Sequence, residues 1–206
     1  MDPDSTTRVD LNDAASPEFW SSRYLTGRTP WDLHGVPEAL HAFLQRSESR
    51  GSVLIPGCGS GYETRAFHDA GYEVTALDFS SAAVERARAL LSPLGHKVQL
   101  GDFFNHQFPG TGFDLVYERT FLCALSPERW PDYAARMADL LGHGGRLVGV
   151  FVYGHASDGP PFPLPPGRET ELLGAGFRLT NSEPVPPSLP VFEGMEERWQ
   201  EWVRVV

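Results

Sequence analysis

The feature that most constrains the fold is a glycine-rich turn between a short apolar strand and a helix. Residues Ser52–Ile55 have the composition of a buried strand, and the turn Pro56-Gly57-Cys58-Gly59-Ser60-Gly61 follows at once. Tyr62 to Ala70 then suit a helix that ends at Gly71. Glycines in such a turn let the backbone bend tightly and approach a ligand without an intervening Cβ. This is the context that a nucleotide-binding turn requires.

Strands and helices alternate along most of the chain. The predicted strands are Ser52–Ile55, Glu73–Leu77, Lys97–Leu100, Phe113–Tyr117, Arg146–Tyr153, Phe177–Thr180 and Glu201–Val206. The predicted helices start at Ser16-Pro17, Pro37, Tyr62, a capping Ser81, Ser126-Pro127 and Glu169. Such alternation predicts an α/β fold, with a mostly parallel sheet and helices on both faces.

Composition excludes several classes of protein. The 206 residues make about one domain. A net charge of −10 with a single lysine, Lys97, argues against nucleic-acid binding, which needs clustered Lys and Arg. The longest strongly apolar stretches are too short for a membrane helix. We therefore expect a small-molecule substrate, with no nucleic acid and no membrane as a partner.

The ends of the chain and its cysteines suggest where it works. The acidic start, MDPDSTTRVDLND, has no apolar core of a signal peptide, so a cytoplasmic protein is expected. Cys58 and Cys123 lie far apart and are predicted to be free thiols. We predict a disordered tail over residues 1–15 and a single domain over 16–206. The histidines form no metal-binding motif, so no metal is expected.

Two acidic residues accompany the glycine turn. Its G-x-G-x-G spacing departs from the G-x-G-x-x-G of dinucleotide sites, so NAD is disfavoured. Asp78 ends the second predicted strand and is placed to accept ribose hydroxyls; Asp102 ends the third and is placed for an adenine amino group. The structural alternatives are a plain tight turn and solvated loop carboxylates. Together, the three features look like the S-adenosylmethionine site of class I methyltransferases.

Longer motifs make the resemblance specific. They are FWSSRYLTGRTPWDL (19–33), VLIPGCGSGY (53–62), ALDFSSAAVERA (76–87), GDFF (101–104), FDLVYERTFLCAL (113–125) and GPPFPLP (159–165). The chain resembles the thiopurine S-methyltransferase family, particularly its plant and bacterial thiol and halide methyltransferase-like branch. The resemblance implies a Rossmann-like, doubly wound seven-stranded sheet with an antiparallel last strand. It also implies S-adenosylmethionine as cofactor, S-adenosylhomocysteine as product, and a monomer whose residues 16–50 cap the cofactor site.

The resemblance also implies which residues bind the cofactor. They are Trp20, Tyr24, Trp31, Gly57, Gly59, Gly61, Asp78, Phe79, Asp102, Phe103 and Arg119. Aromatic faces attract a cation such as the sulfonium by about 0.5–2 kcal/mol each, although an ordinary helix face and turn would show the same spacing. Tyr24 replaces the family's usual tryptophan. Arg119 matches thiopurine-type members where the halide branch has tyrosine, which disfavours halide as the preferred acceptor.

Methyl transfer from a sulfonium is an in-line displacement that needs an aligned nucleophile at about 3–3.5 Å. A thiolate needs little help from a base, so Arg119 is predicted as the catalytic cation that holds the anion. Tyr153 and Phe162 are predicted to wall the acceptor pocket, with ordinary packing as the alternative. Candidate acceptors are sulfide, methanethiol, aromatic thiols, thiopurines, selenium or tellurium species and halides. The alternatives are a small-molecule O-methyltransferase and a non-catalytic cofactor-binding protein.

Half of the prolines are crowded near the C-terminus. Nine of the eighteen fall between Pro160 and Pro190. Pro160–Pro166 belong to the family's Gly-Pro-Pro-aromatic segment, which is expected to form a stiff lid over the acceptor pocket because proline fixes φ. Pro184–Pro190 are expected in a loop between the last two strands.

Overall fold

The computed structural model describes residues 13–48, 50–110, 112–155 and 158–205. Most of the predicted disordered tail, residues 1–12, lies outside the described residues. Residues 13–15 form a turn leading into the first helix: Ser16 N donates to Asp13 O at 2.9 Å, and Trp20 Nε1 donates to Ala14 O at 2.8 Å.

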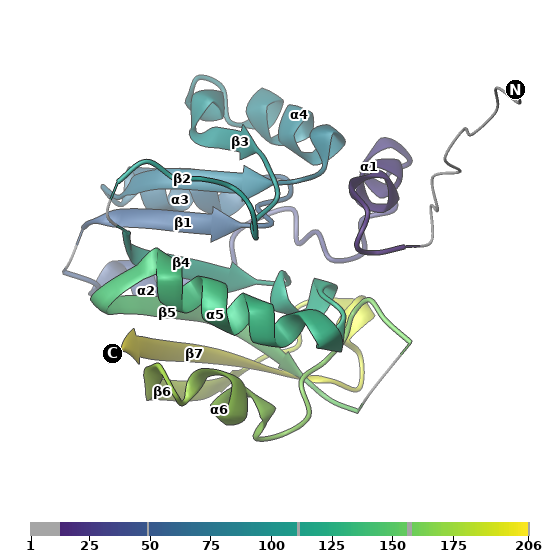
Figure 1. The fold of residues 1–206 in the computed structure, drawn as a ribbon. Helices are drawn as coiled ribbons and strands as arrows, with labels where there is room; N and C mark the ends of the chain where they lie inside the picture. The colour runs from purple at the N-terminus through teal and green to yellow at the C-terminus, as the bar shows by residue number, and fades with distance from the viewer. Residues whose placement is uncertain (1–12, 49, 111, 156–157, 206) are drawn as a thin grey trace, which may run out of the picture.

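Seven strands form one sheet (Figure 1). They are β1 (Ser52–Pro56), β2 (Glu73–Asp78), β3 (Val98–Leu100), β4 (Phe113–Arg119), β5 (Leu141–Tyr153), β6 (Phe177–Val185) and β7 (Glu196–Arg204). Their order is β3-β2-β1-β4-β5-β7-β6. Strands β1 to β5 pair in parallel, whereas β7 is antiparallel to both β5 and β6. The predicted doubly wound sheet with an antiparallel last strand is confirmed.

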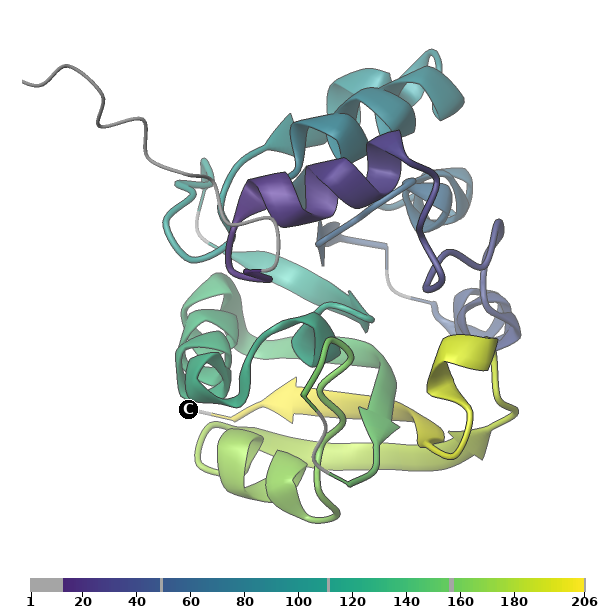
Figure 2. The same ribbon diagram turned by 90° about the vertical axis from the view of Figure 1, so that its right-hand side faces the viewer.

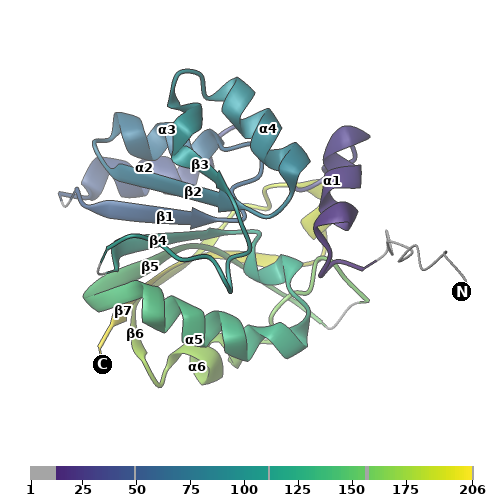
Figure 3. The same cartoon turned by 45° about the horizontal axis from the view of Figure 1, so that its top comes forward.

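Helices cover both faces of the sheet. Helices α2 (Glu38–Arg46), α3 (Tyr62–Asp69) and α4 (Ser81–Leu90) lie on one face, and α5 (Trp130–Leu140) and α6 (Arg168–Leu173) on the other (Figure 3). Successive side chains of a strand point to opposite faces. In β1, Val53 and Ile55 pack with the first group of helices, and Leu54 packs with the second. This explains the unbroken apolar runs, because each central strand is buried on both sides.

Helix α1 (Pro17–Leu25) lies across the carboxyl ends of the strands rather than on a face of the sheet (Figures 1 and 2). Its predicted start is confirmed, because the side chain of Ser16 accepts from Phe19 N and Pro17 occupies the first turn. Phe19 is buried, and Ser21 Oγ lies 2.9 Å from Ser80 Oγ at the start of α4. The first helix is therefore fixed as a cover over the strand ends.

Several predicted boundaries are wrong. Strand β7 begins at Glu196, five residues earlier than predicted, and β6 runs on to Val185, so Pro184 pairs within the sheet instead of lying in a loop. Strand β6 is at the edge, where a missing N–H is tolerated. Strand β5 begins at Leu141 instead of Arg146. The capping residue of α4 is Ser80, which accepts from Ala83 N, and not Ser81.

None of the helices in the described ranges has both the length and the apolar character needed to cross a membrane.

Candidate active site

A cavity of about 300 Å³ opens at the carboxyl ends of β1 to β4, beneath α1. Strand order reverses between β1 and β4, and ligands of open α/β sheets bind at such a switch point. Ten of the residues predicted from the sequence line this cavity: Trp20, Tyr24, Trp31, Gly57, Gly59, Asp78, Phe79, Asp102, Phe103 and Arg119. The structure thus brings together segments that are a hundred residues apart in the chain.

Two glycines of the turn that line the cavity leave no room for a side chain. Gly57 and Gly59 have φ values of 58° and 53°, in the left-handed region. A Cβ on Gly57 would lie 2.6 Å from the Phe121 ring, and one on Gly59 would lie 2.6 Å from Tyr24 Oη. Phe121, in the turn after β4, and Tyr24 of α1 therefore close directly over the bare backbone of the glycine turn.

Asp78 ties this turn to the end of β2. Its two carboxylate oxygens accept from Gly59 N and Ser80 N, each at 2.9 Å. Burial raises the pKa of Asp78 to about 6, although these backbone hydrogen bonds lower it. Each oxygen keeps a further lone pair, so the carboxylate can still accept hydroxyl groups from a ligand.

Asp102 occupies the equivalent place after β3 but is exposed. Its carboxylate accepts from Phe104 N at 3.1 Å and from the side chain of Asn105. Beside it, Phe103 is buried and Phe79 is half-buried, and both line the cavity. Two apolar rings next to an acceptor suit a flat, partly polar group such as adenine.

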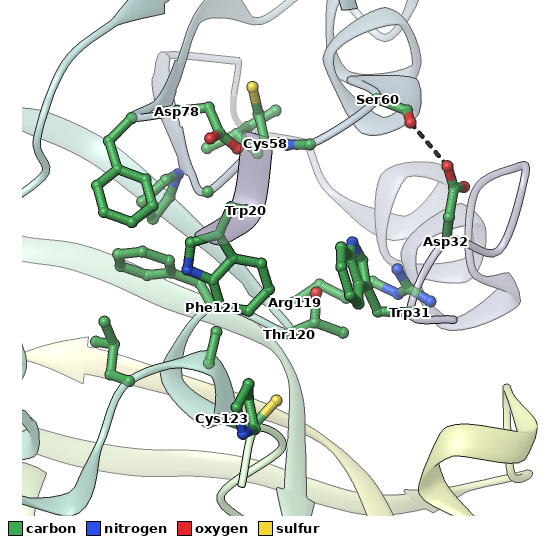
Figure 4. Close-up of a pocket in the computed structure, with 18 of the residues that line it drawn as sticks. Trp20, Trp31, Asp32, Cys58, Ser60, Asp78, Arg119, Thr120, Phe121 and Cys123 are labelled. Carbon is green, nitrogen blue, oxygen red and sulfur yellow. Dashed lines mark hydrogen bonds between the residues drawn. The ribbon is translucent and has the colours of Figure 1, made fainter. Parts of the chain in front are cut away.

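The three predicted aromatic residues of the N-terminal segment pack on one another. The Trp20 and Trp31 rings meet edge to face with centroids 5.2 Å apart, and those of Tyr24 and Trp31 are 5.9 Å apart. Trp31 Nε1 donates to Tyr24 Oη at 3.3 Å. Their arrangement, with Trp20 and Trp31 facing the cavity in Figure 4, forms an aromatic wall that can stabilise a cation.

Asp32, which sequence reasoning did not select, fastens this wall to the rest of the site. Its side chain is 4% exposed. One carboxylate oxygen accepts from Ser60 Oγ at 2.7 Å, drawn as a dashed line in Figure 4, and from Arg86 Nη2 at 3.3 Å. The other accepts from His34 N at 2.8 Å. Asp32 therefore links the Trp31 segment to the glycine turn and to α4.

A charged cluster lies at the end of β4. Arg119 Nη1 is 3.9 Å from the Glu63 carboxylate, and both side chains are about nine-tenths buried. Within the described part of the chain, Arg119 Nη2 and Tyr117 Oη are buried without a hydrogen-bond partner. Burial raises the pKa of Glu63, and the nearby Arg119 charge lowers it. Buried polar atoms that lack a partner beside a cavity indicate a polar ligand.

Glu118 shapes the turn that carries Arg119. The carboxylate accepts from Phe121 N and Leu122 N, each at 3.0 Å, and from Tyr133 Oη at 2.8 Å. These bonds hold Thr120 at a φ of 60°, which is uncommon for a β-branched residue. The turn directs Arg119 toward the cavity and Phe121 onto Gly57.

The far side of the cavity is apolar. It is lined by Cys123, Ala124, Leu125, Pro160, Pro161, Val191 and Phe192. Phe162 N donates to Cys123 O at 2.7 Å, and Leu164 pairs with Tyr153, the last residue of β5. The proline-rich segment therefore closes against the η2 turn (Leu122–Ala124). Figure 2 shows this segment and η4 (Pro190–Phe192) around the strand ends below α1.

Three predicted site residues do not line the cavity. Tyr153 and Phe162 pack in the hydrophobic core beneath α5 and α6, and the prolines that precede Phe162 reach the cavity instead. Gly61 caps α3 with a φ of 78°. Its role is the shape of the turn, because a Cβ there would meet Leu91 at 2.9 Å.

Comparison with known proteins decides the family. The family model of thiopurine S-methyltransferase (TPMT) matches residues 15–197. The chain belongs to the thiopurine S-methyltransferase family. It is an S-adenosylmethionine-dependent methyltransferase, as the resemblance predicted.

Curated relatives of this methyltransferase span most of its length. A probable thiol methyltransferase 2 from Arabidopsis thaliana is 35% identical over 191 residues, covering 88% of this chain and 84% of that protein. Thiocyanate methyltransferase 1 from Brassica oleracea is 30% identical with the same coverage. A thiopurine S-methyltransferase from Vibrio campbellii is 29% identical over an alignment that covers 79% of this chain and 83% of that protein.

Solved structures share its fold at low identity. The 1,6-didemethyltoxoflavin-N1-methyltransferase of Burkholderia thailandensis superposes with a TM-score of 0.72 at 22% identity, covering 92% of this chain and 87% of that one. The N-methyltransferase NodS from Bradyrhizobium japonicum superposes with a TM-score of 0.71 at 18% identity, covering 91% of this chain and 98% of that one. Both were solved with S-adenosylhomocysteine.

The residues of this methyltransferase fit S-adenosylmethionine. Asp78, Asp102 and the two phenylalanines would hold the adenosine, and the aromatic wall would face the sulfonium. The unpartnered atoms of Tyr117 and Arg119 show that the β4 end of the cavity is prepared for a polar group. Bound there, the cofactor supplies a methyl group activated by a positively charged sulfur.

Several cavity residues had no distinctive signal in the sequence. Glu63 stands in the first turn of a helix, where an acid is ordinary because it complements the helix dipole. Asp32 and Cys123 lie inside quoted motifs, but nothing in those motifs says which side chains turn inward. Val191 and Phe192 lie in a segment predicted only as a loop.

Proposed function

We propose that this methyltransferase transfers the methyl group to a small thiol or a related soft nucleophile that binds as an anion. The observation that carries the proposal is that the acceptor side of the cavity offers a cation but no base. Its lining is apolar apart from the Cys123 thiol and the Arg119 and Thr120 side chains at its edge, and among the described residues that line the cavity there is no histidine.

Each carboxylate that lines the cavity already faces a hydrogen-bond donor or a cation, and Asp102 accepts from Phe104 N. Asp32 accepts three hydrogen bonds, Asp78 serves the glycine turn, and Glu63 faces Arg119. Glu118, on β4, does not line the cavity, and its carboxylate accepts from three donors. An alcohol would need a base within about 2.6–3.2 Å of its proton. The geometry therefore favours an acceptor that has already lost its proton, and O-methylation is disfavoured.

The chain's own contribution is to position charge and to exclude water. The aromatic wall stabilises positive charge on one side, and Arg119 can hold the anion on the other. Prolines and Phe192 remove water from the path between them, which strengthens both interactions. Holding the nucleophile aligned at about 3–3.5 Å supplies the entropic part of the rate enhancement.

The chain's own thiols are protected from methylation. Burial raises the pKa of both Cys58 and Cys123 above the usual range, and nearby carboxylates raise it further. Both cysteines are free and lie on the cavity wall. The two cysteines are therefore kept as neutral thiols, which are poorer nucleophiles than an acceptor that arrives as an anion.

The proposal is tested with purified protein and methyl-labelled S-adenosylmethionine against a panel of acceptors. The panel contains sulfide, methanethiol, thiophenol, a thiopurine, selenide, iodide, and the oxygen counterparts methanol and phenol. Labelled product is expected from at least one thiol and from neither alcohol. Turnover of the alcohols alone would establish O-methylation, and no turnover with any acceptor would favour a protein that only binds the cofactor.

The role of Arg119 is tested by comparing Arg119→Gln with wild type. Loss of the cation should lower turnover of anionic acceptors at least tenfold and change S-adenosylhomocysteine affinity less. Arg178→Gln, at an exposed position on β6, is the matched control for loss of one positive charge. Equal losses in turnover and cofactor affinity would remove Arg119 from the acceptor site.

Two finer features belong to the same proposal. Residues 16–206 act as one methyltransferase domain whose N-terminal segment, residues 16–50, covers the cofactor. The protein works in the cytoplasm as a monomer. Light scattering after size-exclusion chromatography should give a mass near 22.8 kDa; a mass twice as large would contradict the monomer.

A further inference from the structure

Glu63 is a buried carboxylate whose place in the cavity is not explained by the fold. It is the second residue of α3, just after the glycine turn that leaves β1, and its side chain faces the cavity instead of solvent. An acid in the first turn of a helix can interact favourably with the helix dipole while it remains exposed to water, so this interaction does not require burial. Burying this one costs free energy unless it has a partner of opposite charge.

Arg119 satisfies this requirement only in part. Its Nη1 is 3.9 Å from Glu63 Oε1, which is beyond hydrogen-bond length. The same guanidinium has a buried nitrogen, Nη2, that lacks a partner among the described residues. A carboxylate and a guanidinium that were built only to stabilise each other would close to a bidentate pair. Their separation leaves the Glu63 oxygens with capacity for a second cation.

The position of Glu63 identifies which part of the cofactor it meets. Asp78 and Asp102, at the ends of β2 and β3, mark the adenosine side, and Cys123 and Pro161 mark the acceptor side. Figure 4 shows Arg119 and Thr120 between Asp78 and Cys123. Glu63 follows the glycine turn of β1 and contacts the β4 end, so it lies by the middle of the cavity. The group of S-adenosylmethionine that remains for this region is its amino-acid end.

From these contacts we infer that Glu63 binds the α-ammonium group of the cofactor and makes that ammonium a requirement for binding. The inference rests on the use of S-adenosylmethionine and not on the identity of the acceptor. A buried carboxylate distinguishes a ligand that carries an ammonium group from one that lacks it. The ligand without the ammonium leaves the negative charge of the carboxylate unpaired. Glu63 therefore determines selectivity between the intact cofactor and adenosine thioethers that lack the amino group.

Isothermal titration calorimetry with four ligands tests this assignment. The ligands are S-adenosylhomocysteine, its analogue with hydrogen in place of the α-amino group, its analogue with hydrogen in place of the α-carboxylate, and 5′-methylthioadenosine. Glu63→Gln should weaken the two ligands that keep the ammonium at least tenfold and change the other two less than twofold. Glu73→Gln, at the exposed start of β2, is the matched control and should change none of them.

The other outcomes contradict the inference in different ways. Equal losses for all four ligands would show that Glu63 only maintains the turn. Losses confined to the ligands with a carboxylate would show that it acts through Arg119 instead. Wild-type protein provides a second test that needs no variant: it must bind S-adenosylhomocysteine at least tenfold more tightly than the analogue without the amino group. Because no acceptor is present, failure of the thiol proposal would leave these measurements unchanged.

Discussion

Removing the Glu118 carboxylate should destabilise the protein and disorder the turn that presents Arg119. The residue is 1% exposed and accepts three hydrogen bonds, two from backbone N–H groups and one from Tyr133. Each of these hydrogen bonds contributes about 0.5–1.5 kcal/mol to a neutral carboxyl and about 1.5–3 kcal/mol to an ionised one, and each buried donor left without an acceptor costs about 1–3 kcal/mol. These effects are not additive, so Glu118→Ala should lower the free energy of unfolding by about 3–5 kcal/mol.

The same residue should make stability depend on pH. Burial raises the pKa of Glu118 from 4.5 to about 7, even though hydrogen bonds from Leu122, Tyr133 and Phe121 lower it. The folded state therefore binds the proton of the Glu118 carboxyl more tightly than the unfolded state does. The stabilisation that this proton gives the folded state is complete below pH 4.5 and is lost as the pH rises through about 7. This rise in the pKa of Glu118 contributes about 3 kcal/mol at most to the free energy of unfolding.

Urea unfolding followed by circular dichroism at several pH values between 4.5 and 8 measures both effects. Glu118→Gln keeps an acceptor for the two backbone donors but cannot titrate, so its stability deficit relative to wild type should shrink as the pH rises. A deficit that is constant across this range would refute the buried, titrating carboxylate. An Ala variant within about 1 kcal/mol of wild type would refute the three-donor geometry.

Two further predictions concern the cofactor side of the cavity. Asp78→Ala should lose at least tenfold in S-adenosylhomocysteine affinity by calorimetry, and the wild-type affinity should weaken below pH 6 as its carboxylate becomes protonated; unchanged affinity in the variant would disprove the assignment. Asp32→Ala frees Ser60, Arg86 and the Trp31 segment, so stopped-flow tryptophan fluorescence should show S-adenosylhomocysteine dissociating at least fivefold faster, whereas an unchanged rate would show that the segment is held without it.

Much of the fold and half of the site could be predicted because they depend on local chemistry. Parallel strands buried on both faces are uniformly apolar, and their carboxyl ends carry the ligand-binding groups at one edge. The ends of β2 and β3 therefore located Asp78 and Asp102 without tertiary information. The aromatic residues of the N-terminal segment came from the resemblance, and the structure places all three on the cavity.

The parts that failed depend on neighbours distant in the chain. Strand β5 is apolar over its whole second half, so its pattern does not show that Tyr153 turns away from the cavity. Strand β7 begins with the exposed Glu196, but Glu197 and Glu201 on the same strand are buried. Ser188 donates to Glu197, and Arg46 and Arg146 pair with Glu201. Pairing with β7 likewise draws Pro184 into β6. No local pattern carries this information.

The central claim, that the acceptor binds as an anion and needs no base from the protein, is tested most directly by one pair of isosteric substrates. Methyl transfer to thiophenol and to phenol is measured with labelled S-adenosylmethionine between pH 5 and 9. The account predicts turnover of thiophenol, with kcat/KM following the ionisation of the thiol itself, and no turnover of phenol. Comparable kcat/KM values for the two, or a profile governed by a group of the protein, would contradict it.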